Sequence, residues 1–147
     1  EQFNDLCQAE VAFSSHGMHA VIPLLMLTCM ALWAGVLVLL IGTCRIAGFL
    51  TGKSLTSYTP GTQHGGAMYW RLNRAHANTL ENLPIFGTMV LVGTIIGCSS
   101  PQFSQLAVLY MGGRIGQSIV HILGGSTPFI MVRFCFFSVQ MLSVTTM

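Results

Sequence analysis

Charged side chains are scarce in this sequence. Asp, Glu, Lys and Arg make up 7% of the 147 residues, whereas about 25% is usual for a soluble domain. Hydrophobic residues make up 52%. This composition excludes a soluble globular domain. The formal net charge of +2 comes from basic residues at or near membrane level, so we expect no nucleic-acid partner.

The sequence also lacks the spacings that metal sites, redox cysteine pairs and serine triads require. No group of His, Cys, Asp or Glu has metal-ligand spacing, so we expect no metal. The five cysteines form no C-x-x-C pair, and an odd number cannot close completely into intrachain disulfides. We interpret them as small apolar packing residues. They are Cys7, Cys29, Cys44, Cys98 and Cys135.

Four long apolar stretches dominate the sequence instead. A helix needs around 20 residues to cross a hydrocarbon core about 30 Å thick. The stretches cover residues 19–43, 74–98, 103–123 and 128–144. Short turns with Pro101 and Pro128 separate the last three, which predicts antiparallel neighbours. We therefore predict an all-α, integral membrane four-helix bundle that fills residues 1–147 as a single domain.

One long connection, residues 44–73, joins the first two stretches. It is rich in Gly, Ser and Thr, and four basic residues lie in it or beside it: Arg45, Lys53, Arg71 and Arg74. Basic loops favour the cytoplasmic side of a membrane. The loop is therefore expected in the cytoplasm or an equivalent compartment, with both termini on the opposite side. An organelle membrane and a bacterial inner membrane both remain open.

The second apolar stretch opens with a polar stripe. On a helix that turns about 100° per residue, one sector of roughly 80° holds Arg71, Arg74, Asn78, Glu81 and Ile85. Ionisable groups at membrane depth cost several kcal/mol unless they are paired or face a cavity, so the stripe indicates a functional or interface-forming face. Extension of the two arginines toward the lipid headgroups is an open alternative.

Polar residues also lie inside the third stretch. Arg114, Ser118 and His121 are spaced i, i+4 and i+7 and share one helix face. Glu81 and Arg114 are expected about 10 Å and about 14 Å below the loop side, at 1.5 Å per residue. At such similar depths they can form an ion pair that pins the second helix to the third. Contact with a ligand is an equally open interpretation.

The block from Arg71 to Phe86 resembles the signature of a known family. Its pattern is Arg71-x-x-Arg74-Ala75-x-x-Asn78-x-x-Glu81-x-x-Pro84-x-Phe86. It is similar to the signature of the membrane-associated proteins in eicosanoid and glutathione metabolism, the MAPEG superfamily. This superfamily includes the microsomal glutathione transferases.

The resemblance implies a homotrimer of four-helix protomers. Glutathione, the co-substrate, would lie between neighbouring subunits near the cytoplasmic side, and a lipophilic substrate would reach it from the membrane lipid. The implied glutathione-binding residues are Arg45, Arg71, Arg74, Asn78, Glu81 and Arg114. Arg45 resembles a basic residue that reaches glutathione from the neighbouring subunit, and Arg114 matches the arginine that opens the third-helix motif.

Three positions depart from the family pattern. Trp70 stands where an acidic residue usually precedes the first signature arginine. His121 replaces a tyrosine found in two kinds of member, the prostaglandin E synthase and the leukotriene-forming synthase. The fourth-helix arginine that activates the glutathione thiol is missing at the ungapped position. Arg133 supplies it if the turn at residues 124–128 carries an insertion. We predict that Arg133 lowers the pKa of the glutathione thiol and that His121 donates a proton.

Two functions follow from these patterns. The first is a glutathione-dependent membrane transferase or peroxidase that acts on lipophilic electrophiles or lipid hydroperoxides. The alternative is a non-catalytic, MAPEG-like lipid-binding scaffold or accessory subunit of a larger membrane protein assembly. The substituted tyrosine and the displaced arginine favour the alternative, and the intact polar stripe favours glutathione binding.

Overall fold

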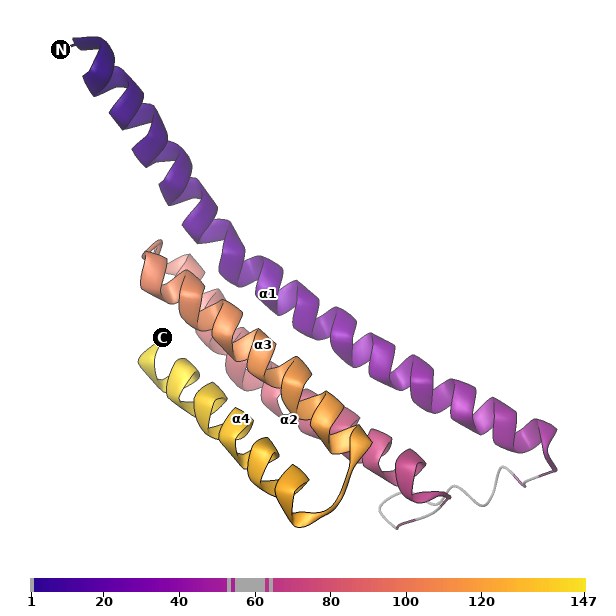
Figure 1. The fold of residues 1–147 in the computed structure, drawn as a ribbon. Helices are drawn as coiled ribbons and strands as arrows, with labels where there is room; N and C mark the ends of the chain where they lie inside the picture. Colours follow the sequence, from indigo (N-terminus) through magenta and orange to yellow (C-terminus); the bar gives the residue numbers. More distant parts are fainter. Residues whose placement is uncertain (1, 53, 55–62, 64) are drawn as a thin grey trace.

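The computed structural model describes residues 2–52, 54, 63 and 65–147, and for residues 2–16 and 18 it describes the backbone alone. Four helices form most of the described chain. They are α1 (Gln2–Leu50), α2 (Ala67–Ile95), α3 (Pro101–Leu123) and α4 (Thr127–Thr146). These ranges contain no strand. α1 packs on α2 and α3, and α4 packs mainly on α3 (Figure 1). The prediction of an all-α bundle is confirmed.

Three segments are long and apolar enough to cross a membrane, namely His19–Leu50 in α1 and the whole of α3 and α4. The chain is therefore an integral membrane protein. α2 has sufficient length, 29 residues, but it is not among the three because polar residues fill its first half. The crossing by α2 and the exact limits of all four spans stay predictions.

Glycines set two helix ends that differ from the predicted ones. α1 continues beyond residue 43 to Leu50, and Gly52 follows with φ 84°, a left-handed conformation that glycine adopts without a Cβ clash. Gly97, with φ 76°, follows the end of α2 in the same way. With α2 beginning at Ala67, the connection between α1 and α2 is shorter than the expected 44–73 loop. Lys53 and residues 55–62 and 64 in it lie outside the described residues.

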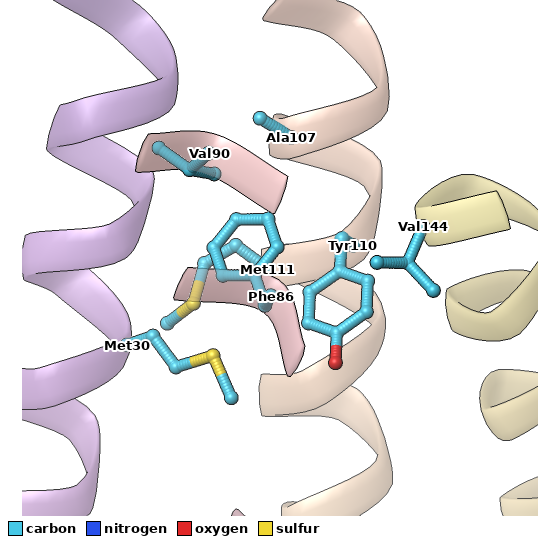
Figure 2. Packing of buried hydrophobic residues seen from close by; sticks show 7 residues of the cluster. All are labelled: Met30, Phe86, Val90, Ala107, Tyr110, Met111 and Val144. Atoms are coloured by element: carbon cyan, nitrogen blue, oxygen red, sulfur yellow. The ribbon is translucent and has the colours of Figure 1, made fainter. Parts of the chain in front are cut away.

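An apolar core fills the space between the helices. Phe86 of α2 stacks on Tyr110 of α3 with ring centroids 4.3 Å apart and planes 4° from parallel. Met30 from α1 and Val144 from α4 complete the same cluster (Figure 2). α4 approaches α3 closely, since a Cβ on Gly116 would lie 2.7 Å from the Phe136 ring. The core thus joins all four helices.

A proline in α1 creates a specific link to α3. Pro23 lies inside the helix and has no N–H, so the carbonyl of His19, four residues earlier, loses its helical donor. The Ser104 hydroxyl donates to that carbonyl at 2.7 Å. Beyond this point the N-terminal part of α1 extends past the other three helices (Figure 1).

Candidate functional site

Most of the predicted site residues lie toward one end of the bundle, where α1 and α3 end and α2 and α4 begin (Figure 1). We call it the loop end, because the long connection joins α1 to α2 there. Glu81 and Arg114 lie near the middle of α2 and α3. The antiparallel order of the helices places the first turns of α2 and α4 beside the last turns of α3. Residues far apart in the sequence are therefore neighbours at this end.

Four basic side chains from three helices form a basic cluster at the loop end. They are Arg71 and Arg74 on α2, His121 on α3 and Arg133 on α4. His121 lies within electrostatic range of all three arginines. Glu81 is the one acidic residue in the sequence after residue 10. The cluster therefore carries an excess of positive charge and is suited to an anionic ligand.

Arg71 joins α2 to the end of α3. Its Nε donates to the carbonyl oxygen of Ile122 at 2.9 Å. That carbonyl lies in the last turn of α3, where backbone oxygens have no helical donor and a cation is favourable. The half-buried side chain of Arg71 is therefore bonded to α3 and does not extend toward the lipid headgroups.

Arg133 is half-buried near the start of α4. Its Nε donates to the carbonyl oxygen of Phe129, one turn earlier, at 3.3 Å. Its own carbonyl oxygen accepts from Gln117 Nε2 on α3 at 3.4 Å. The backbone around Arg133 is thus tied to α3, beside His121.

Arg114 does not form the ion pair expected with Glu81. Among the described residues no salt bridge joins the two side chains. Arg114 is 1% exposed and its Nη1 donates to Gln117 Oε1 at 2.8 Å, whereas Glu81 is exposed. The depths were similar, but Arg114 faces α4 and Glu81 faces outward. Their remaining link is an electrostatic interaction over a longer distance.

A buried polar network surrounds Arg114. Gln140, fully buried on α4, donates through Nε2 to Gln117 Oε1 at 3.2 Å. Arg114 Nε and Nη2 and Gln140 Oε1 are buried without a hydrogen-bond partner. The network crosses the α3–α4 contact directly below the basic cluster.

The polar stripe on α2 faces away from the protomer core. Arg74 and Glu81 are exposed, and Arg71 and Asn78 are half-buried. The core-facing residues of α2 are a different set that includes Leu72, Phe86 and Val90, among others. The stripe is therefore open to a ligand or to another protein surface.

Arg45 contacts α2 within the same chain. Its side chain, on the exposed surface of α1, donates through Nε to the Tyr69 hydroxyl at 2.8 Å. The predicted reach of Arg45 into a neighbouring subunit stays a prediction. Tyr69 lies one turn before Asn73 on α2 and places Arg45 at the loop end.

Tyr69 and Gln117 are two further residues of the site that the sequence patterns did not indicate. Gln117 follows Arg114 by three residues and precedes His121 by four, so its spacing already assigned it to their helix face. Tyr69 lies outside the signature block, and its partner is 24 residues away in the sequence. No spacing pattern reveals a contact of that kind.

The described residues contain no cluster that could bind a metal ion and no disulfide bond. Within them, no three or more His, Cys, Asp or Glu side chains gather as a metal site would require. Cys29, Cys44, Cys98 and Cys135 are free thiols. Cys7 belongs to the part of α1 for which only the backbone is described.

Comparison with known families gives one match. The model of the MAPEG family matches residues 22–147, which cover α2, α3, α4 and all of α1 from Ile22 onward. The match therefore includes the polar stripe and every member of the basic cluster. A search of curated proteins found no match.

Proposed function

The chain belongs to the MAPEG family, and from this premise we propose that it is a glutathione-dependent membrane transferase or peroxidase. Its second substrates would be lipophilic electrophiles or lipid hydroperoxides. The observation that carries the proposal is the basic cluster, in which three helices bring Arg71, Arg74, His121 and Arg133 to the loop end of a membrane bundle.

Glutathione matches the charges of this region. It carries two carboxylates, an ammonium group and a thiol. Arg74, exposed beside Arg71, offers a guanidinium fork to a carboxylate, and the exposed carboxylate of Glu81 suits the ammonium group. Asn78 lies between them on the same stripe and offers an amide. Arg45, held at the loop end by Tyr69, adds another positive charge.

Arg114 is assigned a supporting role. At 1% exposed it is covered by the bundle, so it acts on the bound anion through its charge. Its position beneath the basic cluster raises the positive potential there. Gln117 connects Arg114 to the backbone of Arg133.

The chemistry requires a thiolate at neutral pH. The Arg133 guanidinium stabilises the thiolate over the thiol and so lowers the pKa of the glutathione sulfur. The thiolate then forms a bond to the electrophilic carbon, and His121 gives a proton to the departing or newly formed anion. A lipid hydroperoxide is reduced to its alcohol while two glutathiones are oxidised to the disulfide and one water is released.

We place this site between subunits of a homotrimer, with the loop end in the cytoplasm or an equivalent compartment. The support is the outward-facing polar stripe, because ionisable groups at membrane depth need a covering surface. The clustering of basic residues near the loop supports the sidedness.

The test is glutathione binding to the purified protein, followed by conjugation of a generic electrophile. We expect Arg133→Ala to retain binding, to lose the ultraviolet absorbance of the thiolate and to conjugate about tenfold more slowly or worse. Arg133→Lys, the control, keeps the charge and should keep part of the thiolate signal. If glutathione does not bind to the wild-type protein, the proposed enzymatic function is refuted.

A non-catalytic lipid-binding scaffold is the second candidate. The feature that favours it is His121, which stands where the synthases carry a tyrosine. Glutathione binding without any conjugation or peroxidase activity would support this alternative.

A further inference from the structure

A second proline inside a helix leaves another carbonyl oxygen without its helical donor. Pro84 lies inside α2 and has no N–H, so the carbonyl of Leu80, four residues earlier, loses the bond that it would otherwise accept. The corresponding oxygen of α1, that of His19, accepts from the Ser104 hydroxyl of α3 at 2.7 Å. Both prolines therefore create a need for a donor from outside their own helix.

The polar side chains next to this oxygen on α2 already donate elsewhere. The Thr88 hydroxyl donates to the carbonyl oxygen of Pro84 at 2.7 Å. Asn82 Nδ2 donates to the carbonyl oxygen of Asn78 at 2.9 Å. Both donors are thus engaged in bonds to other turns of α2, and the partner of Leu80 has to come from beyond this helix.

The Leu80 oxygen lies on the outward face of α2. A helical carbonyl points along the axis toward the residue four positions later, and for Leu80 this residue is Pro84, which is exposed. Leu80 itself is 45% exposed. Arg74 and Glu81 are exposed on the same face. Because a membrane offers no water to an unpaired backbone oxygen at this depth, a partner has to approach from outside the protomer.

A neighbouring copy of the chain is a poor source of that donor. Thr28 on α1 and Ser138 on α4 are exposed hydroxyls in the middle of their spans. They donate to the carbonyl oxygens of Leu24 and Phe134 in their own helices, at 3.0 and 2.9 Å. Lipid acyl chains carry no donor at all. A bound ligand with an N–H group is therefore the partner that suits the oxygen best.

We propose that the Leu80 carbonyl accepts a hydrogen bond from the γ-glutamyl amide N–H of glutathione, which makes Pro84 a specificity-determining residue. This inference rests on the glutathione site proposed above. Arg74 and Glu81 are seven residues apart, about 10 Å at 1.5 Å per residue, which is close to the length of an extended tripeptide. With a carboxylate at Arg74 and the ammonium group at Glu81, the amide nearest the ammonium lies beside Leu80.

The experiment compares glutathione with two ester analogues, each of which has oxygen in place of one peptide N–H. The first analogue replaces the γ-glutamyl amide, and the second replaces the amide between cysteine and glycine. Titration calorimetry measures their binding to the full chain in detergent micelles. We expect the first analogue to bind the wild-type protein about fivefold more weakly than the second, the loss typical of one hydrogen bond.

Two variants separate this contact from a change in helix shape. Pro84→Ala supplies an N–H that restores the helical bond to Leu80, so the two analogues should bind this variant with similar affinities. Pro23→Ala is the matched control and should keep the fivefold difference, because it changes a carbonyl that already has a donor in Ser104. The two analogues are compared within each variant, so a general loss of affinity cancels.

The outcomes distinguish this contact from the proposed function itself. Equal affinities of the two analogues for the wild-type protein, or a difference that persists in Pro84→Ala, would overturn the contact while glutathione binding stands. If glutathione itself does not bind, the proposed function fails and the contact fails with it.

Discussion

Arg114 is the one charged side chain that is buried within the described residues, with 1% of its surface exposed. Such a group is costly unless its charge and its N–H groups find partners. The hydrogen bond to Gln117 satisfies one nitrogen, and the Tyr110 hydroxyl lies within interaction range. Gln117 therefore stabilises the fold in part by accepting a hydrogen bond from this buried guanidinium.

This dependence predicts strong coupling between the two residues. Gln117→Leu should lower the free energy of unfolding by about 1–3 kcal/mol, because it leaves a buried charge with one fewer acceptor. In an Arg114→Met background the same change should cost less, and the remaining cost reflects the bonds of Gln117 to Gln140 and to the Arg133 carbonyl. Reversible unfolding in mixed micelles measures both values. Equal costs in the two backgrounds would contradict the account.

At this scale the sequence predicted the grouping of residues better than their individual partners. The positions of Arg74, His121 and Arg133 in antiparallel helices were enough to bring them together. The pairing of Glu81 with Arg114 failed because rise per residue gives depth along a helix, while the direction of a side chain depends on how the helix is rotated against its neighbours. The sequence alone does not show which residues of neighbouring helices are in contact, so it does not define that rotation.

At the scale of elements, Pro23 determines where α1 and α3 share a hydrogen bond. Pro23 leaves the His19 carbonyl without its helical donor, and Ser104 of α3 replaces that donor. In a lipid environment no water is available to do so. The proline thus converts a bond within α1 into a bond between helices.

A double-mutant experiment tests this exchange. Ser104→Ala should cost about 1–2 kcal/mol of unfolding free energy in the wild-type background. It should cost close to nothing with Pro23→Ala, because the new N–H at position 23 restores the helical bond to His19. The two costs are compared by unfolding in the same detergent mixture. A cost that is independent of residue 23 would refute the exchange.

Two glycines of α3 provide a test of how closely α3 packs on α4. A Cβ on Gly116 would meet the Phe136 ring at 2.7 Å, whereas a Cβ on Gly112 would meet nothing within 4 Å. Gly116→Ala should therefore destabilise the α3–α4 contact by about 1–3 kcal/mol. Gly112→Ala, the matched control, should be neutral or stabilise the helix by up to about 1 kcal/mol. Thermal unfolding in detergent distinguishes them, and similar melting temperatures would contradict the packing argument.

The limits of α3 were easier to predict from the sequence than those of α1 and α2. Ser100 accepts a bond from the Phe103 N–H at 3.1 Å, and Pro101 occupies the first helical position, so α3 begins close to where its apolar stretch does. The first apolar stretch ends at residue 43, and the segment after it was assigned to the connection for its content of Gly, Ser and Thr, but α1 continues into that segment. The helix continues to Leu50 and ends just before Gly52, which adopts a left-handed conformation.

At the scale of the whole molecule, the polar stripe on α2 is the surface on which the proposed trimer depends. Glu81 and Arg74 are exposed on a helix whose other face is buried. A trimer that covers them would remove ionisable groups from lipid.

The corresponding prediction concerns mass in detergent. Light scattering, corrected for detergent, should give three times the chain mass of 15.9 kDa. Glu81→Trp, which places a bulky side chain on the stripe, should shift the population toward monomers. Leu142→Trp, at a residue of α4 that is itself 67% exposed, should leave the trimer intact. A monomeric wild-type protein would refute the assembly.

The length of α1 also has an electrical consequence. Its 49 residues extend about 74 Å, more than twice the thickness of a hydrocarbon core of about 30 Å. Asp5 and Glu10 belong to the projecting part, whereas all six basic residues occur from Arg45 onward. In the proposed topology the chain therefore carries a charge dipole along the membrane normal. Each elementary charge moved through 100 mV changes the energy by about 2.3 kcal/mol, so a membrane potential that is negative on the loop side stabilises this orientation and opposes the inverted one.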